Sequence, residues 1–289
     1  MKLISICPSN TELIGYLGLT PSLIGVDNYS DWPEDVQSLP RLGSDLDINM
    51  DKVEELQPDL VLASLSVPGM ERNIEELKKR KIPYVIVPNP KTLTEVGESL
   101  LFVGEATNTS DKAKQLFKKF TLILEKYQLL SQKVQRPTNL YWEWWAKPIF
   151  TPGANNWLTE ISNFAGGRNV FEDKNQASVK TDWEEIRQRN PDVICLVWVG
   201  VQKEHVNPKV ILKRPGAEQM EAIKNHQVFI LDEPLFCRPS PRLLLGLNKI
   251  ASILHPNIYP PFSENIDPLL ETRQEPKRLQ SFDELPFDS

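Results

Sequence analysis

The side chains that most often carry catalysis form no recognisable constellation in this chain of 289 residues. Its histidines share no spacing typical of a metal site, and we expect isolated or hydrogen-bonded imidazoles at His205, His226 and His255. The cysteines contain no C-x-x-C motif, and we expect small packed hydrophobic side chains at Cys7, Cys195 and Cys237. No metal site is therefore predicted.

The sequence patterns of common enzymes are also missing. The chain has no G-x-S-x-G, no H-E-x-x-H and no glycine-rich phosphate loop. Its adjacent carboxylates, Glu54-Glu55 and Glu184-Glu185, fall on amphipathic helical patterns and are expected to be solvated. These observations predict a protein without catalytic activity and without a catalytic cofactor. An enzyme acting on a cofactor-like ligand stays open as an alternative, which turnover would reveal.

Aromatic side chains give a stronger signal, because Trp and Tyr gather on loops and strand ends. Strand alternation predicts that Trp142 and Trp144 share one face, with Trp145 on the other. We expect roughly half of these aromatics to pack in the core and half to line a cleft for a large, partly flat ligand. The set is Tyr29, Trp32, Trp142, Trp144, Trp145, Trp183 and Trp198.

One long helix must position these residues. From Ser110 to Arg136 apolar side chains recur at three- and four-residue spacing, and Pro137 follows, which cannot continue a helix. At about 1.5 Å per residue the helix would run roughly 40 Å, enough to span two lobes. The predicted fold is therefore α/β, with two Rossmann-like lobes of parallel sheet joined by a single backbone helix.

A repeat on either side of this helix supports two related halves. A short helical pattern, a Pro-Asp pair and an apolar strand occur in the same order around Pro58 and around Pro191. Thirteen residues after each proline stands a glutamate, Glu71 in the first copy and Glu204 in the second. Equivalent positions on the two lobes are therefore expected for these glutamates.

Four segments follow from these patterns. We expect an N-terminal α/β lobe over 1–109, the backbone helix over 110–136, a C-terminal α/β lobe over 137–262 and an appended, mobile tail over 263–289. Near the N-terminus, Ser9 and Glu12 have the spacing of a capping box at the start of a helix.

Composition narrows the partners and the location. The formal net charge is −6, without a basic patch, so no nucleic-acid partner is predicted, and a monomer is expected. No apolar run approaches the ~20 residues of a membrane span. The N-terminus shows no signal peptide and Cys7 lies in no lipobox, so the chain as written is expected in the cytoplasm, or outside it if a leader has been removed.

Several motifs resemble those of one protein family. The blocks are Ser5-Ile6-Cys7-Pro8-Ser9-Asn10-Thr11-Glu12, Gly25-Val26-Asp27-Asn28-Tyr29-Ser30-Asp31-Trp32-Pro33, Pro58-Asp59-Leu60-Val61, Phe150-Thr151-Pro152-Gly153, Gly166-Gly167-Arg168-Asn169-Val170-Phe171 and Ser240-Pro241-Arg242. Together they resemble the cobalamin-binding branch of the helical-backbone substrate-binding proteins, which are extracytoplasmic receptors of metal-chelate ABC importers. The resemblance covers roughly Met1 to Leu254.

The resemblance implies a corrinoid ligand, cobalamin or a relative, in a cleft between the lobes. It implies a stacking role for Tyr29, places Trp183, Phe236 and Arg238 on the second lobe's side of the cleft, and sets Leu65 where an enteric, vitamin-binding member of the family has a pocket tryptophan. With the aromatic candidates, the expected ligand-binding set is Tyr29, Trp32, Leu65, Trp142, Trp144, Trp183, Phe236 and Arg238.

The resemblance also implies that Glu71 and Glu204 dock onto arginines of an ABC permease dimer. Haem or a ferric siderophore stays open as the ligand. Anionic siderophores need convergent cationic side chains, whereas the cleft candidates here are aromatic, with only Arg238 and Arg41 basic. This difference favours the corrinoid.

Overall fold

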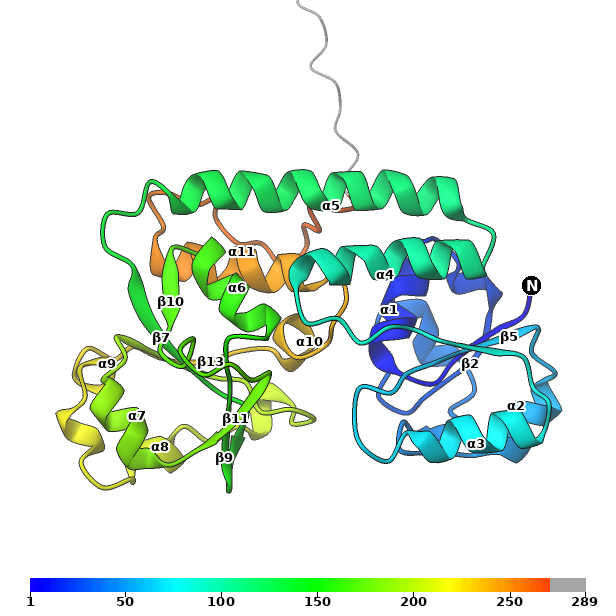
Figure 1. The fold of residues 1–289 in the computed structure, drawn as a ribbon, viewed down its shortest axis with the longest axis horizontal. Coiled ribbons are helices and arrows are strands. Elements are labelled where there is room, and N and C mark those ends of the chain that lie inside the picture. The colour runs from blue at the N-terminus through cyan, green and yellow to red at the C-terminus, as the bar shows by residue number, and fades with distance from the viewer. Residues whose placement is uncertain (271–289) are drawn as a thin grey trace, which may run out of the picture.

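The computed structural model describes residues 1–270, which form two lobes with the same strand order (Figure 1). Both main sheets are parallel, and in each the second strand along the chain lies outside the first, followed by the third and fourth. The strands are β2 (Leu23–Val26), β1 (Leu3–Ser5), β5 (Leu60–Ala63) and β6 (Tyr84–Ile86) in one lobe, and β10 (Gly167–Asn169), β7 (Thr138–Glu143), β12 (Val193–Leu196) and β13 (Val228–Ile230) in the other. The predicted α/β fold and the repeat are confirmed.

Helices cover both faces of each sheet (Figure 1). In the N-terminal lobe these are α1 (Pro8–Tyr16), α2 (Met50–Leu56), α3 (Glu71–Lys79) and α4 (Leu93–Ala106). In the C-terminal lobe they are α6 (Trp157–Phe164), α7 (Trp183–Arg189), α8 (Lys209–Leu212), α9 (Glu221–Lys224), α10 (Glu233–Phe236) and α11 (Leu243–Leu254). Alternate strand residues supply the two cores of a lobe, as Leu3 and Ile4 do on opposite faces of β1.

The helix α5 (Ser110–Ser131) lies along one side of the molecule above both lobes (Figure 1). Its predicted apolar stripe is buried at Ala113, Leu116, Phe120, Leu124 and Tyr127. The helix ends at Ser131 rather than at Arg136, because the chain turns there and carries Val134 against the core on its way to β7.

The core beneath α5 is continuous from one lobe to the other. It contains Leu13 and Leu100 of the N-terminal lobe and Leu140 and Ile161 of the C-terminal lobe, all fully buried. A single hydrophobic core across the lobe boundary holds the two sheets in one orientation more firmly than a linker could.

Two smaller antiparallel sheets lie outside this plan. One contains β11 (Ser178–Thr181), β9 (Ile149–Pro152) and β8 (Trp145–Ala146), and the other β3 (Gly43–Ser44) and β4 (Asp47–Ile48). The chain is completed by short 3-10 helices at Thr20–Ser22, Glu34–Ser38, Lys203–His205 and Ala217–Gln219. Within residues 1–270 no helix is long and apolar enough to cross a membrane.

The capping box predicted at the start of α1 is wrong. Cys7 precedes the first turn and Pro8 begins it, a position where the missing N–H of proline costs nothing. Glu12 does not reach back to the helix start, since its carboxylate is bound by side chains of the other lobe.

Part of the predicted mobile tail is packed. Residues 263–270, which we call the C-terminal strap, contact α1 and the backbone helix α5: the Tyr16 hydroxyl donates to Asp267 over 2.6 Å, and Lys119 Nζ donates to the Leu269 carbonyl over 2.8 Å. Leu269 is buried in the continuous core. Residues 271–289 lie outside the described part of the chain.

The strap predicts a stability difference between two truncations. Ending the chain after residue 262 removes the buried Leu269 side chain and the hydrogen bond to Asp267, and should lower the free energy of unfolding by about 2–5 kcal/mol. Ending it after residue 270 retains every contact described above and serves as the control. Urea denaturation of the two proteins compares them, and equal stabilities would contradict a structural role for the strap.

Candidate ligand-binding site

The carboxyl ends of both parallel sheets point toward the middle of the molecule, where the lobes meet (Figure 1). Loops in this position commonly hold ligands in open α/β sheets. They carry large apolar side chains that are 40–53% exposed: Tyr29 after β2, Leu65 and Val67 after β5, and Trp145 next to the end of β7, with Val199 after β12 at 46%. We call the surface formed by these five side chains (Tyr29, Leu65, Val67, Trp145 and Val199) the apolar face. Such exposure on both lobes is typical of a surface that binds an apolar partner.

A buried carboxylate orients the first of these loops. Asp27 is fully buried, and its Oδ1 accepts the backbone N–H groups of Tyr29 (2.7 Å) and Ser30 (3.0 Å), while the Ser30 hydroxyl donates to Oδ2. Burial raises the pKa of Asp27, partly opposed by the hydrogen bond from Ser30. The turn leaves Tyr29 53% exposed, so its ring is presented to solvent from a fixed backbone.

Arg41 binds the backbone of the same loop. Its Nη1 donates to the carbonyls of Asp27 (3.0 Å) and Ser30 (2.6 Å), and its Nη2 to that of Val36 (3.2 Å). The guanidinium is thus committed to backbone acceptors. Arg41 stabilises the loop and is not presented as a free cation for a ligand.

The C-terminal lobe has a second buried carboxylate at the end of β7. Glu143 is fully buried and accepts from Arg214 Nη1 and Nη2 (2.6 and 3.1 Å), from the Tyr141 hydroxyl (2.9 Å) and from Trp198 Nε1 (3.3 Å). Burial, followed by the Glu143 charge, raises the pKa of Tyr141, so the phenol is the donor. Arg214 also lies over the Trp183 ring at 4.9 Å. Glu143 therefore binds Trp198 directly and is linked to Trp183 through Arg214.

The predicted ligand-binding residues differ in burial: some are exposed, some are half-buried and two are fully buried. Tyr29 and Leu65 are exposed on the apolar face, and Trp144 and Trp183 are half-buried. Trp32 is half-buried against Tyr16, with ring centroids 4.9 Å apart.

Two of the predicted ligand contacts require correction. Trp142 and Phe236 are fully buried and pack on each other with ring centroids 5.6 Å apart. Trp142 Nε1 donates to Ser162 Oγ over 2.9 Å, so its only polar group is also satisfied inside the lobe. Neither side chain offers surface to a ligand. Alternation was predicted correctly, but the covered face of β7 is the core beneath α5.

Arg238 also differs from its predicted role. It is only 12% exposed, and its guanidinium is paired with Glu12, Asp31 and Glu233. The pairs with Glu12 and Asp31 cross the lobe boundary, so Arg238 connects the lobes and does not reach into open space.

Glu71 and Glu204 are exposed and follow equivalent strands. Glu71 is the first residue of α3, after the loop from β5, and Glu204 lies in the 3-10 helix after the loop from β12. The Glu71 carboxylate accepts the N–H of Gly69 over 2.7 Å. The predicted equivalence of position agrees with the shared strand order, while docking onto a permease stays a prediction.

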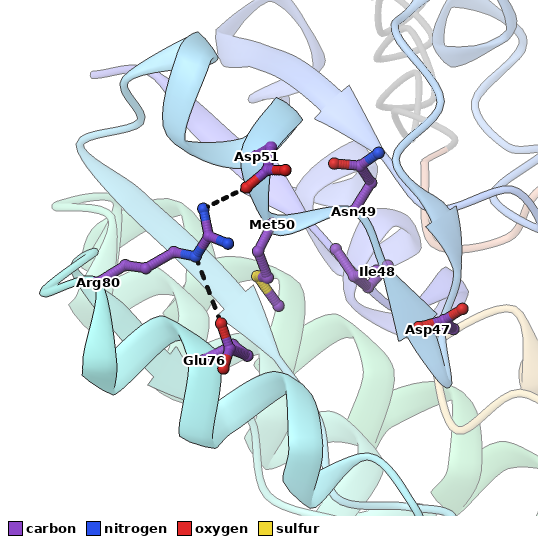
Figure 2. Close-up of a pocket in the computed structure, with 7 residues that line it drawn as sticks. All are labelled: Asp47, Ile48, Asn49, Met50, Asp51, Glu76 and Arg80. Atoms are coloured by element: carbon purple, nitrogen blue, oxygen red, sulfur yellow. Dashed lines mark hydrogen bonds and ion pairs between the residues drawn. The ribbon is translucent and has the colours of Figure 1, made fainter.

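A pocket of the N-terminal lobe is lined by residues at the start of α2 and on α3 (Figure 2). There Arg80 pairs with Asp51 (2.6 Å), Glu54 (2.8 Å) and Glu76 (3.4 Å), between α2 and α3. The lining residues are Asp47, Ile48, Asn49, Met50, Asp51, Glu76 and Arg80, none of them in the predicted ligand-binding set. We interpret this pocket as a surface depression bridged by ion pairs. In residues 1–270 no group of three or more His, Cys, Asp or Glu side chains could hold a metal ion.

The roles of several residues of the site were not predicted from the sequence. Asp27 lies inside a motif that carries the family resemblance but had no assigned role, and Glu143 lies between Trp142 and Trp144 and had none either. The available signal was a single carboxylate at the carboxyl end of an apolar strand, where burial demands partners. Arg214 gave no signal, because its pairing with Glu143 spans 71 positions of sequence.

Known proteins share this architecture. A family model described as "Periplasmic binding protein" matches residues 3–235. The chain belongs to this family. A relative of this binding protein is the uncharacterised ABC transporter substrate-binding lipoprotein YvrC of Bacillus subtilis, 31% identical over 267 residues, which are 89% of this chain and 81% of YvrC.

Two further comparisons differ in the ligand that their names give. The vitamin B12-binding protein of Vibrio cholerae serotype O1 is 26% identical over 254 residues, which are 88% of each chain. The solved structure of the periplasmic heme-binding protein RhuT from Roseiflexus sp. RS-1 has a TM-score of 0.77 at 20% identity, covering 86% of this chain and 96% of RhuT. The second shows the shared fold. This periplasmic binding protein is therefore a substrate-binding protein of the ABC-transporter type, which implies a small-molecule ligand and a permease partner.

The Asp27 anchor predicts a selective effect on the Tyr29 loop. Asp27→Ala leaves two backbone N–H groups and a hydroxyl without their acceptor and should destabilise the protein by about 1–3 kcal/mol. Asp27→Asn keeps an acceptor oxygen and should cost less. Asp35→Ala changes an exposed carboxylate nearby and is the control. Hydrogen exchange of residues 27–33 with urea denaturation measures both effects; unchanged exchange in Asp27→Ala would refute the anchor.

Proposed function

We propose that this protein binds a corrinoid, cobalamin or a close relative, on the apolar face between its lobes, without catalysis. The observation that carries the proposal is the exposure of Tyr29, on the loop after β2, and of Trp145, in β8 just after β7, on opposite lobes at the carboxyl ends of the sheets. A corrin ring is large, partly flat and partly apolar, and aromatic side chains pack well on such a surface. The B12-binding relative supports the same ligand class.

The charged groups of the site favour a corrinoid over an anionic chelate. The two arginines that the sequence offered for the cleft are both engaged: Arg41 with backbone carbonyls and Arg238 with carboxylates. A siderophore with carboxylate or catecholate groups binds best to convergent unpaired cations. Haem, which the name of RhuT carries, is the alternative that competes most directly.

One comparison separates these ligands. The purified protein is titrated calorimetrically with cyanocobalamin, haemin and a ferric siderophore, and visible absorption spectra are recorded for each mixture. We expect saturable binding of cyanocobalamin with the tightest dissociation constant. Preference for haemin or the siderophore would refute the proposed ligand, and chemical conversion of the corrinoid would indicate an enzyme instead.

Tyr29 and Trp183 are expected to contribute to affinity from opposite lobes. An aromatic face stacked on a large ligand is worth about 0.5–1.5 kcal/mol beyond area burial, so Tyr29→Ala and Trp183→Ala should each weaken corrinoid binding roughly threefold to tenfold. Leu122→Ala, an exposed apolar position on α5, is the control and should bind normally. Calorimetric titration of the three variants decides it, and unchanged affinity in both aromatic variants would remove these residues from the site.

We further propose that Glu71 and Glu204 dock the protein on an ABC permease dimer. The support is their exposure after equivalent strands of lobes with the same topology, because a receptor with two matched halves suits a two-fold partner. Charge-assisted pairs with arginines would set the register of that contact.

Reversing both charges tests the docking proposal. Glu71→Arg combined with Glu204→Arg should abolish uptake through the cognate permease while leaving the corrinoid dissociation constant unchanged. Glu75→Arg with Glu218→Arg, exposed glutamates elsewhere on the two lobes, provides the matched control. Uptake that survives the first pair would return these glutamates to the solvated surface.

A further inference from the structure

Five charged side chains form one connected cluster where the lobes meet, which we call the inter-lobe clamp. Glu12 and Asp31 come from the N-terminal lobe, and Glu233, Arg238 and Arg242 come from the C-terminal lobe. The carboxylates of one lobe are thus neutralised mainly by guanidinium groups of the other. The relative position of the two lobes therefore depends in part on these ion pairs.

Glu12 is the centre of the clamp. Its residue is 1% exposed, yet all three of its side-chain donors belong to the other lobe. Oε1 accepts from Arg238 Nη1 (3.2 Å) and Arg242 Nη1 (3.0 Å), and Oε2 accepts from Ser240 Oγ. A carboxylate removed from water is tolerated only with such partners, so separating the lobes would leave it buried and unpaired or expose it to solvent.

Arg238 extends the clamp to the Tyr29 loop. Its Nη1 and Nη2 donate to the two oxygens of Asp31 (2.6 and 3.1 Å), and its Nε donates to Glu233 (3.2 Å). Burial alone would lower the pKa of Arg238, but Glu12, Glu233 and Asp31 raise it above its ordinary range, so the guanidinium is charged throughout. Asp31 lies two residues after Tyr29, and the forked pair therefore fixes that loop against the C-terminal lobe.

Trp32 completes the connection. Arg242 lies over its ring at 5.3 Å, and the ring packs on Tyr16 of α1 at 4.9 Å between centroids. The loop that carries Tyr29 therefore contacts the C-terminal lobe twice: Asp31 forms an ion pair with Arg238, and Trp32 forms a cation–π contact with Arg242.

We propose that Glu12 and Arg238 are positioning residues, which hold the lobes and the Tyr29 loop in the binding-competent arrangement before the ligand arrives. In its effect on affinity this inference rests on the proposed function. All three nitrogens of the Arg238 guanidinium are engaged by carboxylates, so its role is to set the spacing of the apolar face. Preset spacing saves a ligand the free energy of ordering the lobes and raises its apparent affinity.

Inter-lobe distance in the ligand-free protein is the direct test. Spin labels are placed at the exposed positions Lys78 on α3 and Gln188 on α7 through cysteine, and pulsed electron paramagnetic resonance records their distance distribution. Protein with only its native cysteines controls for background labelling. We expect a narrow distribution in the starting protein and a broadened or shifted one in Glu12→Gln and Arg238→Ala. Corrinoid dissociation constants should rise at least about tenfold in the same variants.

Two further variants control for charge and for stability. Arg80→Ala also removes an arginine that pairs with three carboxylates, but all of them lie in one lobe. It should change neither the distance distribution nor the affinity. Arg238→Lys keeps the charge but loses the forked geometry, and it should fall between the starting protein and Arg238→Ala if the alanine variant folds poorly.

The outcomes separate the clamp from its alternatives. Unchanged distance distributions in both Glu12→Gln and Arg238→Ala would overturn the proposal. Weakened binding in Arg238→Ala alone, with an unchanged distribution and normal binding in Glu12→Gln, would make Arg238 a ligand contact and would also overturn it. If the starting protein binds no corrinoid, the proposed function fails, whereas the distance measurement still decides whether the clamp exists.

Discussion

A carboxylate that is buried away from water needs hydrogen-bond donors that stay in place in the folded protein. Three carboxylates around the apolar face of this protein meet that requirement. Asp27 binds the backbone of its own loop, and Glu143 binds an arginine and a tryptophan of its own lobe. Glu12 instead takes its donors from the opposite lobe. The first two orient loops within a lobe, and the third orients the lobes. Exposed side chains such as Tyr29 can be held in a defined place because buried charges behind them leave little freedom.

Hydrophobic packing supplies the other half of this arrangement. The core beneath α5 passes from one lobe to the other without interruption, and α4 approaches α5 so closely at Gly104 that an added Cβ would lie 2.4 Å from that of Ala113. The lobes are thus joined by a shared core, by a helix and by the clamp. Large hinge movements would have to break all three, and α5 itself contains neither glycine nor internal proline where it could bend.

Local patterns were enough to predict the architecture, because periodicity reports which face of an element is covered. The stripe of α5 and the Pro-Asp repeat predicted the backbone helix and the matched sheets. The same patterns could not say what covers a face, so Trp142 was assigned to a cleft although the core beneath α5 covers it. They also could not pair residues distant in sequence: Glu12 has the spacing of a capping box, but its partner Arg242 lies 230 positions away. Within this site, therefore, local patterns predicted neither which aromatic side chains the core covers nor which distant residues pair.

The C-terminal strap has a consequence for how the protein is made. The contact between Tyr16 and Asp267 joins residues 251 positions apart, so α1 leaves the ribosome well before its partner in the strap has been made. At a synthesis rate of about 5–20 residues per second, the delay is on the order of 10–50 s. During that interval the N-terminal lobe lacks the strap and the basic side of the clamp, and its α1 surface is open. The contacts of α1 with the strap can thus form only after residues 263–270 have been synthesised.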